Sequence, residues 1–205
     1  LGTGSTSLLM VQLLAERVAG GLKIQAVATS EAIAAEARRQ GLSLVEEYPN
    51  FQRVDLTLDG ADEADCEGRL IKGGGGALLR EKLVATASTR LVIMIDESKR
   101  VQELGQNWPV PVEIVPFGWS RLQKRIEELG AEVRLRQKDG QTFRTDHGNY
   151  IFDCRFGPMA EPEKIHAALI QLTGVVETGL FLGLTNTLVT GCESGEVHMQ
   201  HFYPA

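Results

Sequence analysis

Cysteine is scarce in this sequence, and its placement excludes two ways of stabilising a small fold. Cys66, Cys154 and Cys192 lie far apart and form no C-x-x-C pair. A zinc knuckle needs closely spaced cysteine pairs, and a disulfide framework needs a denser, even set. We therefore expect neither, and we expect the chain to work in a reducing compartment, the cytoplasm.

An excess of positive charge is also missing. The 205 residues include 27 Asp and Glu against 21 Lys and Arg, which gives a net charge of −6, and no basic run is present. Proteins that bind nucleic acid through its phosphates carry clustered positive charge. The composition therefore argues against nonspecific nucleic-acid binding, and we expect no nucleic-acid partner.

Long apolar runs are absent too. No stretch reaches the roughly 18 apolar residues of a membrane span, and no secretory signal peptide is visible. We therefore expect no membrane partner. The chain opens at Leu1, inside a motif and without a methionine, so we expect residues ahead of it. A targeting segment in that region remains open.

A run of four glycines, residues 73–76, is the most distinctive local feature that is present. Glycine reaches positive φ freely and has no side chain, so backbone N–H groups here can converge on an anion. Good helix formers follow over residues 77–87, and the start of a helix also favours an anion. Glu81 lies one turn into that helix, where its carboxylate can face the same pocket. A solvated surface glutamate is the alternative interpretation.

The first residues offer a second candidate anion site. Thr3, Gly4, Ser5 and Thr6 precede residues 8–19, whose few polar positions predict a largely buried helix. Backbone N–H groups and hydroxyls at a helix start can bind an anion, although a plain capped turn is the alternative. The lysine of the G-x-x-x-x-G-K-[ST] loop and the third glycine of the dinucleotide fingerprint are lacking. We therefore expect neither ATP nor NAD as a cofactor.

Strands and helices alternate over the first part of the chain. We expect strands at 24–28, 54–59, 70–71 and 91–95 and a helix from Ser30 to Gln40. This alternation predicts a doubly wound, Rossmann-like α/β domain with a parallel sheet.

Ligands of such sheets bind beyond the carboxyl ends of the strands. Asp59 and Asp62 follow one expected strand and Lys99 follows another, so we regard all three as site candidates, with a solvated lysine as the alternative for Lys99. A calcium loop is disfavoured because Leu56 and Leu58 occupy positions that would need oxygen ligands. We expect no metal at this site.

After Trp108 the order of expected elements becomes β-α-β-β-α-β, which is typical of a ferredoxin-like α+β domain. Prolines bracket its first strand, residues 110–115, so we expect an edge or linking strand there. The last strand is expected over 175–181. We therefore divide the chain into a catalytic domain of residues 1–108 plus 187–205 and a smaller domain of residues 109–186.

Five motifs, taken together, resemble the type A ribose-5-phosphate isomerases over nearly the whole chain. They occur in the family's order and approximate spacing, and they are Gly2-Thr3-Gly4-Ser5-Thr6, Asp59-Gly60-Ala61-Asp62-Glu63, Lys72-Gly73-Gly74-Gly75 with Leu79-Arg80-Glu81-Lys82, Asp96-Glu97-Ser98-Lys99 and Pro111-Val112-Glu113-Ile114-Val115-Pro116. One departure is that the family's N-terminal helix and strand, which precede the first motif and can supply a phosphate-binding lysine, are not seen here.

The resemblance implies interconversion of ribose 5-phosphate and ribulose 5-phosphate through a cis-enediolate, without a metal or cofactor, in a homodimer or homotetramer. It implies Glu81 as the base, Lys72 with the N–H groups of Gly73 to Gly75 as oxyanion donors, and Asp59 and Asp62 as partners of the sugar hydroxyls. The substrate-binding residues it implies are Thr3, Gly4, Ser5, Thr6, Asp59, Gly60, Ala61, Asp62, Lys72, Gly73, Gly74, Gly75 and Lys99.

Two other interpretations remain at this point. A non-catalytic sugar-phosphate sensor would use the same pocket, but such regulators usually carry a DNA-binding module, and no helix-turn-helix pattern is seen. A related enzyme of the same broad fold, an amino-sugar-phosphate deaminase or a coenzyme A transferase, is the other. The deaminase is expected to need a histidine, and no histidine lies in a motif loop.

Overall fold

The computed structural model describes residues 1–45 and 53–203. Its main sheet has four strands in the order β1-β4-β12-β13, of which the first three run parallel and β13 is an antiparallel edge strand. Leu91, Ile93 and Ile95 of β4 are buried in the core. The bounds of the strands are β1 (Thr57–Asp59), β4 (Leu91–Asp96), β12 (Thr187–Gly191) and β13 (Val197–His201).

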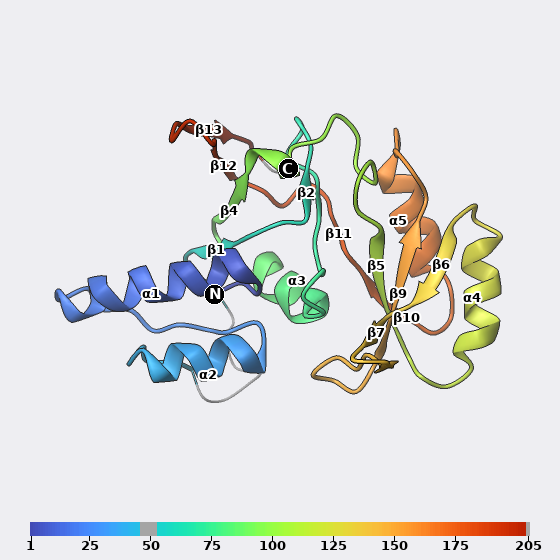
Figure 1. The fold of residues 1–205 in the computed structure, drawn as a ribbon, viewed down its shortest axis with the longest axis horizontal. Coiled ribbons are helices and arrows are strands. Elements are labelled where there is room, and N and C mark those ends of the chain that lie inside the picture. Colours follow the sequence, from blue (N-terminus) through green and yellow to red (C-terminus); the bar gives the residue numbers. More distant parts are fainter. Residues whose placement is uncertain (46–52, 204–205) are drawn as a thin grey trace.

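Three helices accompany this sheet (Figure 1), namely α1 (Ser5–Ala19), α2 (Glu31–Arg39) and α3 (Leu78–Thr86). The Ser30 hydroxyl accepts a hydrogen bond from Ile33 N at 3.3 Å and so caps α2, as the sequence predicts. Ile33 and Ala37 then share one buried cluster with Val11 of α1. The two helices therefore stabilise each other beside the sheet.

Helix α1 is more exposed than its sequence predicts. Val11 is fully buried, but Leu9 and Leu13 are each 63% exposed. A helix buries only the stripe that meets its neighbour, and here that stripe is the side that packs on α2. The expectation of a largely buried helix is therefore wrong for this structure.

The strand expected over residues 24–28 is reduced to a single bridge between Ala26 and Leu44. On its other side, Thr29 N donates to Leu1 O at 3.1 Å, and Gly2 N donates to Leu58 O at 3.0 Å. Among the described residues, Leu1 and Gly2 thus join this segment to β1. Their position brings the loop that begins at Thr3 to the carboxyl end of β1.

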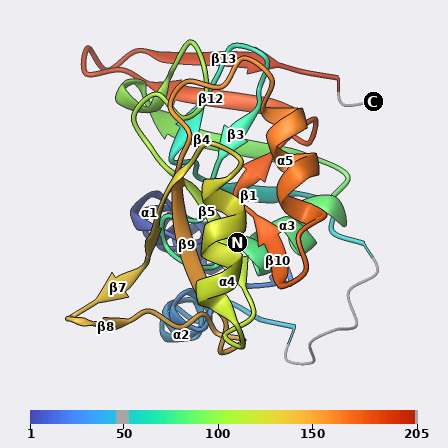
Figure 2. The ribbon, with the colours of Figure 1, turned by 90° about the vertical axis from the view of Figure 1, so that its right-hand side faces the viewer.

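The second large sheet is antiparallel, with the order β10-β5-β9-β6 that a ferredoxin-like unit adopts. Figures 1 and 2 show its two helices on the side away from α1 and α2, which confirms the fold class expected from the sequence. The elements are β5 (Val110–Ile114), α4 (Trp119–Glu127), β6 (Glu132–Leu135), the hairpin β7 (Gln137–Lys138) and β8 (Gln141–Thr142), β9 (Tyr150–Arg155), α5 (Pro162–Ile170) and β10 (Val175–Thr178).

Strand β5 is central in this sheet, so the expectation of an edge or linking strand is wrong. Pro111 is tolerated because of where β10 ends. The last residue of β10, Thr178, pairs with Val112, so Pro111 lies one position beyond that ladder. The Pro111 carbonyl still accepts a hydrogen bond from Gly179 N at 2.6 Å. The missing N–H of proline therefore removes no hydrogen bond within the β5–β10 ladder.

A three-stranded sheet, β11-β3-β2, joins the two larger ones, and its strands are β2 (Glu63–Ala64), β3 (Leu70–Ile71) and β11 (Leu180–Phe181). The single strand expected over 175–181 is broken at Gly179, because β10 pairs with β5 whereas β11 pairs with β3. Gly179 O accepts a hydrogen bond from Lys72 N at 2.8 Å. A side chain at position 179 would collide with the Lys72 carbonyl, so this approach requires glycine.

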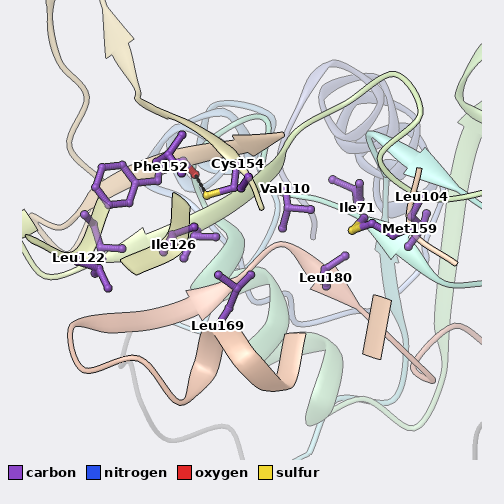
Figure 3. Packing of buried hydrophobic residues seen from close by; sticks show 14 residues of the cluster. Ile71, Leu104, Val110, Leu122, Ile126, Phe152, Cys154, Met159, Leu169 and Leu180 are labelled. Carbon is purple, nitrogen blue, oxygen red and sulfur yellow. Dashed lines mark hydrogen bonds between the residues drawn. The ribbon is translucent and has the colours of Figure 1, made fainter. Parts of the chain in front are cut away.

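The largest hydrophobic cluster crosses between these sheets (Figure 3). It contains Phe152 and Cys154 of β9 and Leu169 of α5, together with Ile71 of β3 and Leu180 of β11. Because Ile71 directly precedes Lys72, the core of the smaller unit also anchors the start of the glycine run. Shared packing of this kind fixes the two parts of the chain relative to each other at this point.

We propose the same division as the sequence suggests, with residues 1–108 and 187–205 forming the larger unit and residues 109–186 the smaller one. Residues 46–52 and 204–205 of the larger unit lie outside the described part. The short β11 belongs to the smaller segment but pairs with β3 of the larger one. Within the described residues, the helices are all too short or too polar to cross a membrane.

Candidate active site

A cavity of about 100 Å³ lies where the carboxyl end of β1 meets the start of α3. The sequence-predicted residues meet here although they come from four separate stretches of the chain. Asp59 lies just behind the residues that line the cavity, in contact with Lys72. Ser5 is the first residue of α1, and its side chain lies outside the described part. The cavity is lined by Thr3, Gly4, Thr6, Gly60, Ala61, Asp62, Lys72, Gly73, Gly74, Gly75, Glu81 and Lys99.

Lys72 lies at the centre of a buried charge cluster. Its Nζ is 2.9 Å from Asp59 Oδ2 and 3.3 Å from Glu81 Oε2, and it donates a hydrogen bond to Gly60 O at 2.7 Å. Burial alone would lower the pKa of Lys72, but the carboxylates of Asp59 and Glu81 outweigh it and raise the pKa above its ordinary value. Lys72 is therefore a fixed cation.

Glu81 has the properties of a base that works near neutral pH. Its side chain is 3% exposed, and burial is the main reason that its pKa rises to about 7. Lys72 opposes this rise, whereas Asp59 and Asp62 add to it. Among the described residues, no well-oriented donor forms a hydrogen bond with Glu81 Oε2. The carboxylate can therefore accept a proton from a bound molecule.

The glycine run is shaped by close contacts as well as by turn geometry. Gly73 and Gly76 have φ values of 99° and 85°, which favour glycine. Gly74 N donates to Asp62 Oδ2 at 2.7 Å, and a Cβ at position 74 would lie 2.6 Å from Asp62 Oδ1. The sequence predicts that these N–H groups face a ligand, but the one on Gly74 is used to hold Asp62.

Another part of the cavity wall combines a helix start with a lysine. Gly4 is the N-cap residue of α1, and no side chain caps the backbone N–H groups there. Lys99, at the end of the short 3₁₀ helix η1 (Glu97–Lys99), lies on the cavity wall with its side chain 31% exposed. The Thr3 hydroxyl contacts Thr29 Oγ1 at 2.8 Å and Ser30 Oγ at 3.1 Å, so it supports the loop. This part of the wall offers positive charge to an anion.

Two contributors are missing from the predicted site residues, although Gly2 belongs to the first motif. Gly2 leaves room for the Asp59 carboxylate, because a side chain at position 2 would collide with it. Arg136 directly follows β6 of the smaller unit and donates hydrogen bonds to the carbonyls of Gly73 and Gly74 at 2.8 and 3.1 Å. It lies 63 residues from Gly73 along the chain and in no motif, so no local pattern connects it with the glycine run.

A buried carboxylate beside a buried lysine, in a cavity at the carboxyl end of a parallel strand, is typical of an enzyme active site. Residues 25–195 match the family model described as ribose 5-phosphate isomerase A (phosphoriboisomerase A). The chain belongs to the ribose 5-phosphate isomerase A family, which confirms the resemblance seen in the motifs.

Individual relatives agree. Proteins named ribose-5-phosphate isomerase A from Gloeobacter violaceus and Bacillus mycoides are 51% and 47% identical over 196 residues; these alignments cover 95% of this chain in each case, and 85% and 88% of the relatives. Ribose 5-phosphate isomerase from Plasmodium falciparum gives a TM-score of 0.94 at 35% identity, over 98% of this chain and 89% of that one. A D-ribose-5-phosphate isomerase in complex with phospho-erythronic acid gives 0.94 at 30% identity, with the same coverage. The sensor and the related enzymes are therefore not favoured.

Proposed function

We propose that this chain interconverts D-ribose 5-phosphate and D-ribulose 5-phosphate through a cis-enediolate, with Glu81 as the general base. The observation that carries this assignment is the buried Glu81 carboxylate, which has a pKa of about 7 and lies 3.3 Å from the Lys72 ammonium. A base of this pKa can remove a proton from carbon and return it under the same conditions. The family membership supports the choice of substrate.

The cavity suits a proton transfer between neighbouring carbons. Glu81 is held on helix α3, so one carboxylate can reach both C1 and C2 with little motion. The negative charge that develops on the substrate oxygen needs donors already in place, and Lys72 supplies a buried ammonium for it. Asp59 and Asp62 are proposed to bind the sugar hydroxyls and to assist ring opening. No metal or cofactor is assigned to any step.

The 5-phosphate is proposed to lie at the opposite end, against Gly4 to Thr6 and Lys99. Uncapped N–H groups at the start of α1 and the Lys99 ammonium favour a doubly charged group there. With the phosphate at this end, the reacting carbons of the sugar face Lys72 and Glu81. The glycine run is therefore assigned to the reacting end and not to the phosphate.

We infer that the chain assembles as a homodimer or homotetramer. Several large apolar side chains are exposed on the single chain, among them Leu9 and Leu13 of α1 and Phe117, which is 95% exposed. Large apolar side chains that are exposed on a single chain often mark surfaces that a second subunit covers. Light scattering coupled to gel filtration distinguishes the two assemblies. The cytoplasmic location likewise stays a prediction.

A direct assay tests the proposed activity. The purified chain is expected to form ribulose 5-phosphate from ribose 5-phosphate, and the rate should be unchanged after dialysis against EDTA, because the proposed steps use only protein groups. Coupled detection of the ketose measures both rates. No ketose formation would contradict the isomerase assignment, and a rate abolished by EDTA and restored by a divalent cation would contradict the metal-free mechanism.

The pKa of Glu81 predicts the pH dependence. Because the base must be ionised, kcat/KM is expected to be constant above about pH 8 and to fall nearly tenfold per pH unit well below the pKa of about 7. The substrate phosphate titrates near pH 6. Its titration adds a second acid limb to the kcat/KM profile, about one pH unit below the limb of Glu81. Initial rates at low substrate concentration measure this profile. A flat profile across neutrality would show that a different group acts as the base.

A further inference from the structure

We propose that Arg136 is a positioning residue for the isomerisation, which sets the peptide groups of the glycine run so that they hold Asp62 and face the substrate. The inference rests on the proposed function. Arg136 lies outside the cavity wall and approaches the glycine run from behind, through two carbonyl groups. It would therefore act on the reaction through the backbone and without touching the substrate.

The guanidinium of Arg136 is itself firmly oriented. Nε donates to Asp153 Oδ2 at 3.0 Å, and Nη2 pairs with Asp153 Oδ1, so the carboxylate binds the fork in a bidentate way. The side chain is only 12% exposed, and the guanidinium carbon lies 5.9 Å from the centre of the Phe143 ring. Nη1 is the remaining corner of the fork, and it points at the glycine run.

Nη1 donates to Gly73 O at 2.8 Å and to Gly74 O at 3.1 Å. A peptide unit is planar and trans, so its N–H points away from its C=O. The unit that begins at Gly73 thus directs the Gly74 N–H to Asp62 Oδ2, 2.7 Å away. The unit that begins at Gly74 directs the Gly75 N–H away from Arg136. Gly75 is itself one of the residues that line the cavity.

The Gly75 N–H has no hydrogen-bond acceptor within the described part of the chain. A positive charge at the carbonyl end of a peptide unit makes its N–H a stronger donor. Arg136 thereby prepares one N–H for a developing oxyanion and uses the other to hold a carboxylate. Its charge also favours ionised Asp62: burial raises the pKa of Asp62, whereas the Gly74 hydrogen bond and the charges of Lys72, Lys99 and Arg136 oppose that rise.

Glycine has no side chain to restrict these peptide units, and a four-glycine run is intrinsically free to rotate. An external support is therefore needed if the run is to present its N–H groups in one geometry. Phe143 lies against the same run from the same side, because a side chain at Gly76 would collide with its ring. Arg136 and Phe143, which flank the β7–β8 hairpin of the smaller unit, thus supply the rigidity that the glycines lack.

The test compares Arg136→Met with the wild-type chain in ribose 5-phosphate isomerisation. We expect kcat to fall about 10-fold to 100-fold, because small misplacements of reacting groups are costly, while KM stays within about threefold. Competitive inhibition by inorganic phosphate should change by less than about twofold, since the phosphate end is untouched. Arg134→Met is the matched control. It lies on β6, two residues before Arg136, is 79% exposed and pairs only with Glu132 among the described residues.

Arg136→Lys keeps the charge but not the fork, so it should give a kcat between those of the wild type and Arg136→Met. If Arg136→Met does not fold, the lysine variant carries the test. Wild-type kcat in a folded Arg136 variant would overturn the positioning role. An equal loss in kcat and phosphate binding, in step with the folded fraction, would also overturn it. No turnover by the wild-type chain would instead overturn the proposed function and the inference that rests on it.

Discussion

Replacing Glu81 with Gln is expected to lower kcat by about 10²-fold to 10⁴-fold, the usual contribution of a general base. The glutamine side chain would have nearly the same shape as the glutamate but could not accept a proton from carbon. The side chain lies 3.3 Å from Lys72 and is almost fully buried, so water cannot readily take over its role. Steady-state rates with saturating ribose 5-phosphate measure the loss.

Binding should survive the same change, because Glu81 is assigned to the chemistry and the phosphate end is separate. Glu113→Gln is a matched control, since Glu113 of β5 is equally buried but accepts hydrogen bonds from Thr145 and Asn149 in the loop before β9. We expect its kcat to stay within about threefold of wild type. If Glu81→Gln turned over as fast as this control, Glu81 could not be the base.

Replacing Lys72 with Ala is expected to lower kcat by about 10²-fold to 10³-fold, because the ammonium would no longer stabilise the developing oxyanion. It also lowers the pKa of Glu81 in the wild-type chain. Without it, the pKa of Glu81 should rise above about 7, and the acid limb of the kcat/KM profile should move to higher pH. A complete pH profile of the variant measures both effects.

The loss of Lys72 also leaves Asp59 and Glu81 buried without their counter-ion, and breaking a buried ion pair typically costs about 3–5 kcal/mol of stability. Rates must therefore be referred to the folded fraction, measured by thermal unfolding. Lys82→Ala is the control. The Nζ atom of Lys82 lies 4.9 Å from the centre of the Phe181 ring. Lys82 binds Glu177, however, and lies outside the cavity wall. An unshifted pH profile in Lys72→Ala would contradict the coupling between Lys72 and Glu81.

Much of the site could be predicted because its parts follow strand ends or a glycine run. Asp59 ends β1 of the parallel sheet, where the strand-end rule places ligand-binding residues. Lys72 follows β3, which lies in the antiparallel three-stranded sheet, and is found instead because it begins the glycine run. Asp59 and Asp62 raise the pKa of Glu81, as clustered carboxylates do. In the structure burial is the larger cause for Glu81, and burial depends on packing that a single sequence does not display.

The errors share a physical origin, which is tertiary context. Pro111 suggests an edge strand, yet the ladder between β5 and β10 stops at Val112 and does not include the proline. Leu9 and Leu13 make α1 look buried, although helix packing covers only its other side. Arg136 reaches the glycine run from the segment between β6 and β7, and the long separation in sequence leaves no local signal.

Gly179 gives the molecule a mechanical property beyond its sheet topology. One of its peptide groups binds β5 and the next binds the backbone of Lys72, and there is no room there for a side chain. The smaller unit therefore holds the backbone of Lys72 in a fixed position. An engineer who exchanges this module between family members, or inserts a tag or sensor into it, must keep the Pro111–Gly179–Lys72 connection intact.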